Sequence, residues 1–153
     1  MQLQPLLLFL HLAGVIVWLG GMFFAYVCLR PTAVELFEPP QRLRLWRGVF
    51  ARFFVWVWWA VLLIAASGLI MIGQHGFGAA PLGWHLMMVS GLLMIGIYIY
   101  VATIPYAALV QAVEAEDWKA GGAALNRIRQ LVGTNLLLGV LTVCFATLGR
   151  HLA

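Results

Sequence analysis

The sequence predicts an all-α membrane protein: a bundle of four transmembrane helices with both termini on the outer side of the membrane. Three observations lead to this class. Of the 153 residues, 64% are hydrophobic and only 9% are charged, whereas soluble domains contain roughly 25% charged residues. Four apolar runs are long enough to cross a bilayer. The lysines and arginines are concentrated in the connections on one side, so the net charge of +4 gives no indication of nucleic-acid binding.

Each apolar run holds about the 20 residues that a helix needs to cross the hydrocarbon core. Helices are expected because backbone groups in lipid must find hydrogen-bond partners within their own segment. The third run is long and is expected to kink, or to extend beyond the membrane, at Pro105. We therefore expect a single domain over residues 1–153, with spans at about residues 5–29, 53–73, 82–110 and 131–149.

The connections predict the orientation of the bundle. The connections at residues 30–52 and 111–130 together hold eight lysines and arginines, whereas residues 74–81 hold no charged residue. The positive-inside rule then places the two basic connections in the cytoplasm and both termini outside. The expected location is the inner membrane of a bacterium, with the termini in the periplasm.

Two stretches of the basic connections are expected to lie at the membrane surface. RLRLWRGVFARFF alternates arginine with leucine, tryptophan and phenylalanine, as in a helix that lies on a membrane. In EAEDWKAGGAALNRIRQLV, the Gly121–Gly122 pair is expected to interrupt the chain before a short amphipathic run. Both stretches are expected to be connectors that face water or lipid headgroups.

All four histidines fall on the predicted outer side. His11 lies within the first span, about 9 Å below its outer end, and His85 lies near the outer end of the third. His75 is in the outer connection, and His151 follows the last span. Ionisable residues inside spans are candidates for function. Histidines at similar depth on two helices can hold a metal ion or a haem iron; a hydrogen bond across helices for His11, and an interfacial position for His85, are the alternatives.

The face of the first span below His11 continues, at helical spacing, through Gly14, Trp18 and Gly21. Glycines on such a face allow another helix, or a flat macrocycle, to approach the backbone closely. The sequence therefore gives these residues two interpretations: a cofactor-binding face, or helix packing through small residues.

Other candidate ligands lie near the outer end of the third and fourth spans. Met87 and Met88 follow His85, and thioether sulfur together with imidazole suits Cu(I), although methionine also fills apolar cores. Arg150 is the one outer-side cation in the sequence. It is a candidate partner for a haem propionate, or a side chain that extends to the interface.

Four motifs in order, HLAGVIVWLGGMFFAYVCLRP, RFFVWVWW, GWHLMM and NLLLG, resemble the copper resistance protein D (CopD) family over most of the chain. The first span matches best, with His11, Trp18, Gly20, Gly21 and the exit Arg30-Pro31. The resemblance implies a multi-helix inner-membrane protein linked to copper entry or copper resistance. Larger members have more spans, or a fused periplasmic copper-binding domain, so this four-span chain is expected to act alone, as an oligomer or with a partner.

The layout also resembles the HemJ-type protoporphyrinogen oxidases, which are small four-helix proteins that bind haem b through histidine. His11, Trp18 and Asn135 match that pattern. The lysines that the family has near its first- and third-span histidines are missing from LLFLHLAG and GWHLMMVS. This resemblance therefore implies haem binding without porphyrinogen oxidation.

Three functions remain open at this point. The first is copper handling at an outer site with His11, His85, His75, Met87 and Met88 as ligands. The second is a haem b redox protein with His11 and His85 as axial ligands, which as an enzyme would be a haem-dependent oxidoreductase. The third is an accessory subunit without a metal. The expected partners are the lipid bilayer, a periplasmic copper or electron-transfer protein, and a second copy of the chain bound through the small-residue face.

Overall fold

The computed structural model describes residues 3–149, and within this range the secondary structure is entirely helical. Four helical segments are long and apolar enough to cross a membrane, which confirms the predicted class of a multi-pass membrane protein. Arg150 and His151 lie outside the described residues. The elements are α1 (Leu3–Phe23), the π-helix η1 (Phe24–Leu29), α2 (Arg30–Leu36), α3 (Pro39–His75), the 3₁₀ turn η2 (Phe77–Ala79), α4 (Leu82–Thr103), α5 (Pro105–Glu114) and α6 (Trp118–Leu148).

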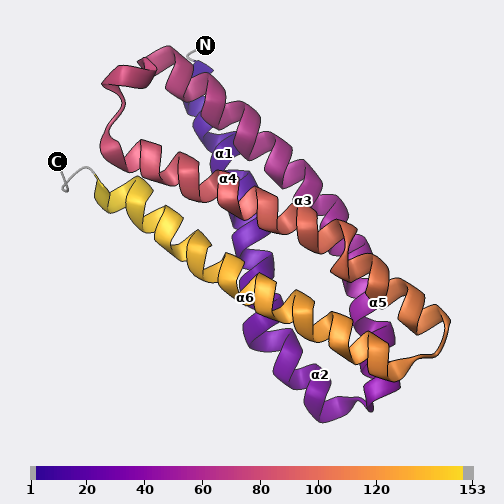
Figure 1. The fold of residues 1–153 in the computed structure, drawn as a ribbon. Coiled ribbons are helices and arrows are strands. Elements are labelled where there is room, and N and C mark those ends of the chain that lie inside the picture. The colour runs from indigo at the N-terminus through magenta and orange to yellow at the C-terminus, as the bar shows by residue number, and fades with distance from the viewer. Residues whose placement is uncertain (1–2, 150–153) are drawn as a thin grey trace.

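Successive segments run antiparallel, so the first and third run in one direction and the second and fourth in the other (Figure 1). The start of α1, the end of α6 and the α3–α4 connection lie at one end of the bundle, which we call the terminal end. The α2–α3 and α5–α6 connections lie at the other, which we call the basic end. α1 packs mainly along α3, and α4 packs mainly along α6, while α5 joins the two pairs through α3 and α6.

The basic connections differ from the sequence expectation because the long helices α3 and α6 continue into them. RLRLWRGVFARFF is not a separate surface helix but the first turns of α3. Leu43, Trp46 and Phe50 are buried there, and they continue the spacing of three to four residues that Phe54 and Val57 extend into the membrane span. One apolar face therefore runs through connection and span, and the helix stays in the bundle.

The expected interruption at Gly121–Gly122 is also wrong, because α6 runs through both glycines. Gly121 is buried, and a Cβ added there would lie 3.0 Å from Cδ1 of Leu43. The chain turns earlier, at Glu116, whose φ of 55° is in the left-handed region. The Asp117 carboxylate then caps α6 by accepting a hydrogen bond from the backbone N–H of Ala120 at 2.9 Å.

Prolines account for two irregular positions in the long segments. The third segment breaks at Ile104, directly before Pro105, as the sequence predicts. In the first segment, the N–H of Arg30 bonds to the carbonyl of Ala25, five residues back. Pro31 has no N–H to continue the normal ladder. The helix therefore widens into the π-helix η1 just before the basic end.

Aromatic rings fill the centre of the bundle. Phe50 and Phe54 stack with their centroids 5.2 Å apart, and Tyr98 meets Phe54 edge-on at 5.7 Å. The Tyr98 hydroxyl donates a hydrogen bond to the Phe54 carbonyl at 2.9 Å, which joins α4 to α3. Large apolar side chains also cover the outside of the bundle, as expected where lipid is the solvent.

Candidate functional site

His11 is held against α3 by one of its two ring nitrogens. Its Nδ1 lies 3.1 Å from the carbonyl oxygen of Ile64 and 3.1 Å from Oγ of Ser67. A carbonyl oxygen can only accept, so Nδ1 carries the hydrogen, and in the neutral ring Nε2 keeps its lone pair. The Ser67 hydroxyl donates to carbonyls of its own helix, which leaves Oγ free to accept from His11.

The second nitrogen of His11 is not used by the fold. Within residues 3–149, no protein atom forms a hydrogen bond with Nε2, and the side chain is half-buried. A histidine whose Nδ1–H is fixed by a backbone carbonyl, with Nε2 left free, has the usual arrangement of a metal-binding histidine. Ser67 is thus a positioning residue for the ring.

The ring of His11 lies close to the backbone of α3. A Cβ added at Gly68 would lie 3.3 Å from Cε1 of the ring. Met71 is four residues beyond Ser67 and is half-buried, so it shares the helix face that holds His11. Sequence reasoning missed this methionine because it lies in another span. Only the pairing of α1 with α3 shows that it lies one helical turn beyond Ser67, which bonds to the histidine.

The glycines below His11 make room for α3. A Cβ at Gly14 would lie 2.9 Å from the backbone oxygen of Ala60, and a Cβ at Gly21 would overlap the ring of Phe53. Trp18 lies between them, 4% exposed, and meets Tyr98 edge-on at 6.0 Å. Protein atoms therefore fill the space along this face, as in helix packing through small residues.

His85 has a different environment from His11. Its Nδ1 lies 3.2 Å from the carbonyl oxygen of Pro81, and its Nε2 lies 3.1 Å from that of Phe77. The Phe77 ring meets the imidazole edge-on at 4.8 Å. Both nitrogens thus point to carbonyls of the α3–α4 connection, so a neutral ring can donate to only one of them at a time.

The remaining candidates gather near this connection. His75 is the last residue of α3 and is exposed, with its ring 5.0 Å from that of Trp84. Met87 and Met88 are half-buried in α4. The candidate residues thus form two groups, one on the α1–α3 interface and one around the α3–α4 connection. Within the described chain, no three histidine, cysteine or acidic residues cluster tightly enough to hold a metal ion.

A buried polar group lies deeper in the bundle. Asn135 of α6 is 3% exposed, and its Nδ2 donates to the Met94 carbonyl at 3.4 Å. Its Oδ1 has no hydrogen-bond partner among the described residues. A cavity of about 20 Å³, also lined by Trp18 and Tyr98, adjoins this side chain. Such a cavity has room for about one water molecule.

Replacing Asn135 with leucine tests whether Oδ1 has a partner. Leucine has a similar volume and removes a buried acceptor without a bond, so we expect thermal stability to rise, by about 1 kcal/mol. Thermal unfolding in detergent, followed by circular dichroism, measures the change. A clear fall in stability would contradict the expectation, and would mean that the Nδ2 bond to Met94, or a bond from a water molecule to Oδ1, stabilises the bundle.

Comparison with known proteins assigns the chain to a family. The model of the family described as copper resistance protein D matches residues 47–148, two thirds of the chain. The matched region contains most of α3 and all of α4, α5 and α6, with His85, but not α1 with His11. No curated protein and no solved structure matches the chain. The family match agrees with the four apolar segments and the helical fold, so the chain belongs to the copper resistance protein D (CopD) family.

Proposed function

We propose that this protein handles copper as its cargo at the terminal end of the bundle, with Nε2 of His11 as a ligand. The observation that carries the proposal is the fixed Nδ1 of His11, bonded to Ile64 and Ser67 at 3.1 Å each, with a free Nε2 beside it. Membership of the CopD family supports copper as the cargo. The proposed setting is the bacterial inner membrane, with the terminal end in the periplasm.

The donor set near His11 suits Cu(I). This ion accepts few ligands and prefers thioether and imidazole donors. Met71 lies on the α3 face that holds His11, and no carboxylate lies in the four predicted spans. A site of one imidazole and one or two thioethers would bind a soft monovalent ion loosely enough to release it. That property suits transfer of copper rather than permanent storage.

The second group of residues would meet the ion closer to the aqueous phase. His75 is exposed at the end of α3, and Met87 and Met88 lie in the first turns of α4. In this proposal, these residues accept copper from the solution or from a periplasmic partner. His85 serves mainly to hold the connection through Pro81 and Phe77.

Copper is favoured over haem by the placement of the two span histidines. Axial ligation by two histidines needs one nitrogen from each ring on opposite sides of the same iron. His11 bonds to α3, while both nitrogens of His85 face the carbonyls of its own connection. The face below His11 is occupied by α3 at Gly14 and Gly21, which leaves no gap there for a macrocycle.

Copper binding and an absorption spectrum of the purified protein test the proposal together. We expect the protein in detergent to bind Cu(I) in competition with a chromogenic chelator, and to show no Soret band after incubation with haem. Reconstituted vesicles with a trapped Cu(I) indicator then distinguish passage across the membrane from transfer to a partner. A folded protein that binds no copper would overturn the proposal. A Soret band would identify a haem-binding protein instead.

A further inference from the structure

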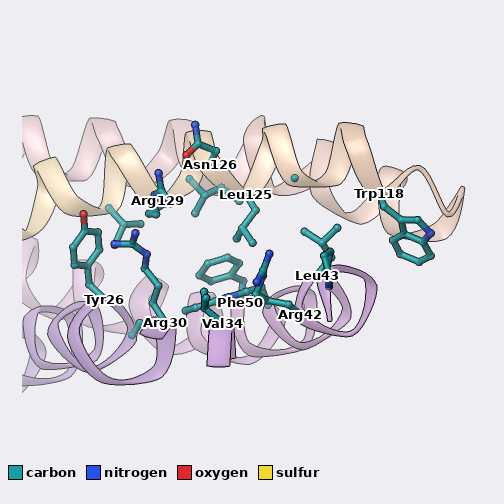
Figure 2. Close-up of a pocket in the computed structure, with 16 residues that line it drawn as sticks. Tyr26, Arg30, Val34, Arg42, Leu43, Phe50, Trp118, Leu125, Asn126 and Arg129 are labelled. Atoms are coloured by element: carbon teal, nitrogen blue, oxygen red, sulfur yellow. The ribbon is translucent and has the colours of Figure 1, made fainter. Parts of the chain in front are cut away.

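A cavity of about 280 Å³ lies at the basic end, away from the proposed copper site. It is lined by η1 and α2, by the start of α3 and by α6, and it is open on one side (Figure 2). The widened turn of η1 contributes Ala25 and Tyr26 to its lining. Much of the wall is apolar or aromatic, including Leu43, Trp46, Phe50, Leu125, Ile128 and Val132.

Three arginines also line this cavity: Arg30, Arg42 and Arg129, which we call the cavity arginines. Arg30 and Arg42 extend from the α2 and α3 side into the gap below α6 (Figure 2), and both are half-buried. The guanidinium of Arg30 also lies 5.2 Å from the centroid of the Tyr26 ring. The cavity therefore combines apolar walls with concentrated positive charge.

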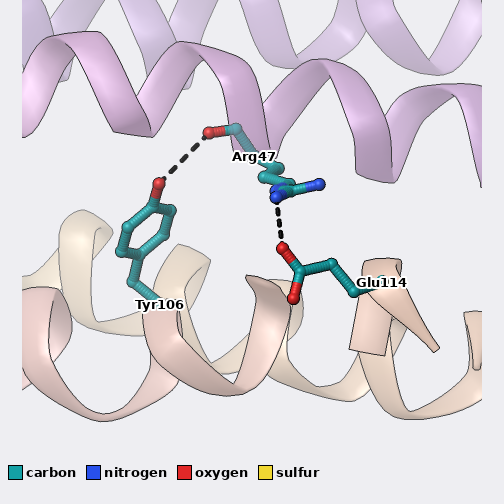
Figure 3. A network of polar contacts seen from close by, with 3 residues as sticks. All are labelled: Arg47, Tyr106 and Glu114. Atoms are coloured by element: carbon teal, nitrogen blue, oxygen red, sulfur yellow. Dashed lines mark hydrogen bonds and ion pairs between the residues drawn. The ribbon is translucent and has the colours of Figure 1, made fainter. Parts of the chain in front are cut away.

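Two acidic residues of the basic end form ion pairs with other arginines. Arg47 donates to Glu114, and Arg44 donates to Glu116 at 3.1 Å. Figure 3 shows the first pair, beside the Tyr106 hydroxyl that bonds to the Arg47 carbonyl. These are the two ion pairs among residues 3–149, so the cavity arginines have no carboxylate partner there. The other acidic residues, all exposed and outside the cavity lining, are Glu35, Glu38 and Asp117.

The cavity lies at the depth expected for lipid headgroups. Arg30 directly follows the predicted first span, which ends at residue 29, and Arg129 comes two residues before the fourth, which begins at residue 131. Basic pockets between transmembrane helices at this depth attract anionic headgroups, because the phosphates of the leaflet lie beside them. Ala25 and Val132, which also line the cavity, fall within the predicted first and fourth spans.

We propose that this cavity binds the headgroup of an anionic phospholipid from the leaflet at the basic end. The phosphate contacts the cavity arginines, and the glycerol and first methylene groups lie against Trp46 and Phe50. A free phosphate ion would leave these aromatic walls without a partner. Ligand pockets measure about 300 to 1,000 Å³, so a volume of about 280 Å³ suits a headgroup rather than a larger ring system.

Lipid binding by the full-length protein tests this site. Native mass spectrometry of the detergent-purified protein would be used to compare phosphatidylglycerol with phosphatidylcholine of identical acyl chains. The wild type is expected to prefer phosphatidylglycerol. Changing all three cavity arginines to glutamine is expected to remove the preference. The loss of each arginine is expected to lower the affinity for phosphatidylglycerol about five-fold. The matched control changes three other basic residues, which lie outside the cavity lining: Arg52→Gln, Lys119→Gln and Arg127→Gln.

The control separates a specific site from general surface charge, because both triple variants have the same net charge. Equal loss of preference in the two variants, or full retention in the cavity variant, would overturn the proposal. So would displacement of phosphatidylglycerol by inorganic phosphate, which would identify a site for free anions. Should the triple cavity variant fail to fold, Arg129→Gln is compared with Arg127→Gln, since both side chains are exposed on α6. The first is expected to weaken lipid binding and the second to leave it unchanged.

Discussion

The His11→Asn variant is expected to fold like the wild type and to lose at least about ten-fold in affinity for Cu(I). The amide nitrogen of asparagine takes nearly the position of Nδ1 and can still donate to the Ile64 carbonyl, which His11 contacts at 3.1 Å. Asparagine has no counterpart of Nε2, so the proposed ligand is removed while the hydrogen bond to α3 is kept. Chelator competition measures the affinity, and thermal unfolding measures the stability.

Two further variants make this result interpretable. His11→Leu removes the hydrogen bond as well as the ligand, and is expected to cost about 1 kcal/mol of stability. His85→Asn is expected to leave Cu(I) affinity nearly unchanged, because both nitrogens of His85 are directed at backbone carbonyls. Wild-type copper affinity in His11→Asn would rule out His11 as a ligand and leave it as a packing residue.

The Gly83→Ala variant is expected to destabilise the protein by about 1–3 kcal/mol, the usual cost of overfilling a packed interface. A Cβ at Gly83 would lie 2.5 Å from the backbone oxygen of Phe145 and 2.9 Å from Cα of Gly149. These are backbone atoms, which cannot turn aside as a flexible side chain can. Relief of the overlap therefore requires α4 and α6 to separate at the terminal end, and thermal unfolding in detergent measures the cost.

Gly96→Ala is the matched control on the same helix. A Cβ at Gly96 has nothing within 4 Å, and alanine is favoured over glycine in a helix by up to about 1 kcal/mol. The two variants are thus expected to change stability in opposite directions. Similar behaviour of both would mean that the close approach of α4 to α6 does not limit stability.

The membrane class and the four spans could be predicted from the sequence because length and hydropathy decide them directly. The break at Pro105 could be predicted for an equally local reason. The packing of the basic connections in the bundle could not be predicted, since the arginines of RLRLWRGVFARFF suggest a helix that lies on the membrane surface. Burial of Leu43 and Trp46 depends on partners from distant segments. Gly121 likewise suggests a break, yet it serves as a contact point for Leu43.

The candidate site was predictable only in part. A histidine inside a span identifies His11 as a residue to examine, and no further structure is needed for that step. Its partners on α3 follow from the register of two helices, which a single sequence does not contain. The same is true of the bonds that His85 makes to Pro81 and Phe77. From the sequence alone, the cavity arginines indicate only the orientation of the spans. The structure is needed to distinguish them from Arg44 and Arg47, which pair with Glu116 and Glu114.

The pairing of α1 with α3 and of α4 with α6 has a consequence for biogenesis. Each of these long helices packs mainly against a long segment that is its neighbour in the sequence. The first hairpin can therefore assemble in the bilayer while the ribosome is still making the second. Helices that associate after insertion need only short-range searches when their partners are neighbours. Contacts of α3 with α5 and α6 then join two preassembled halves. The aromatic centre and the cavity at the basic end are completed only at that last step.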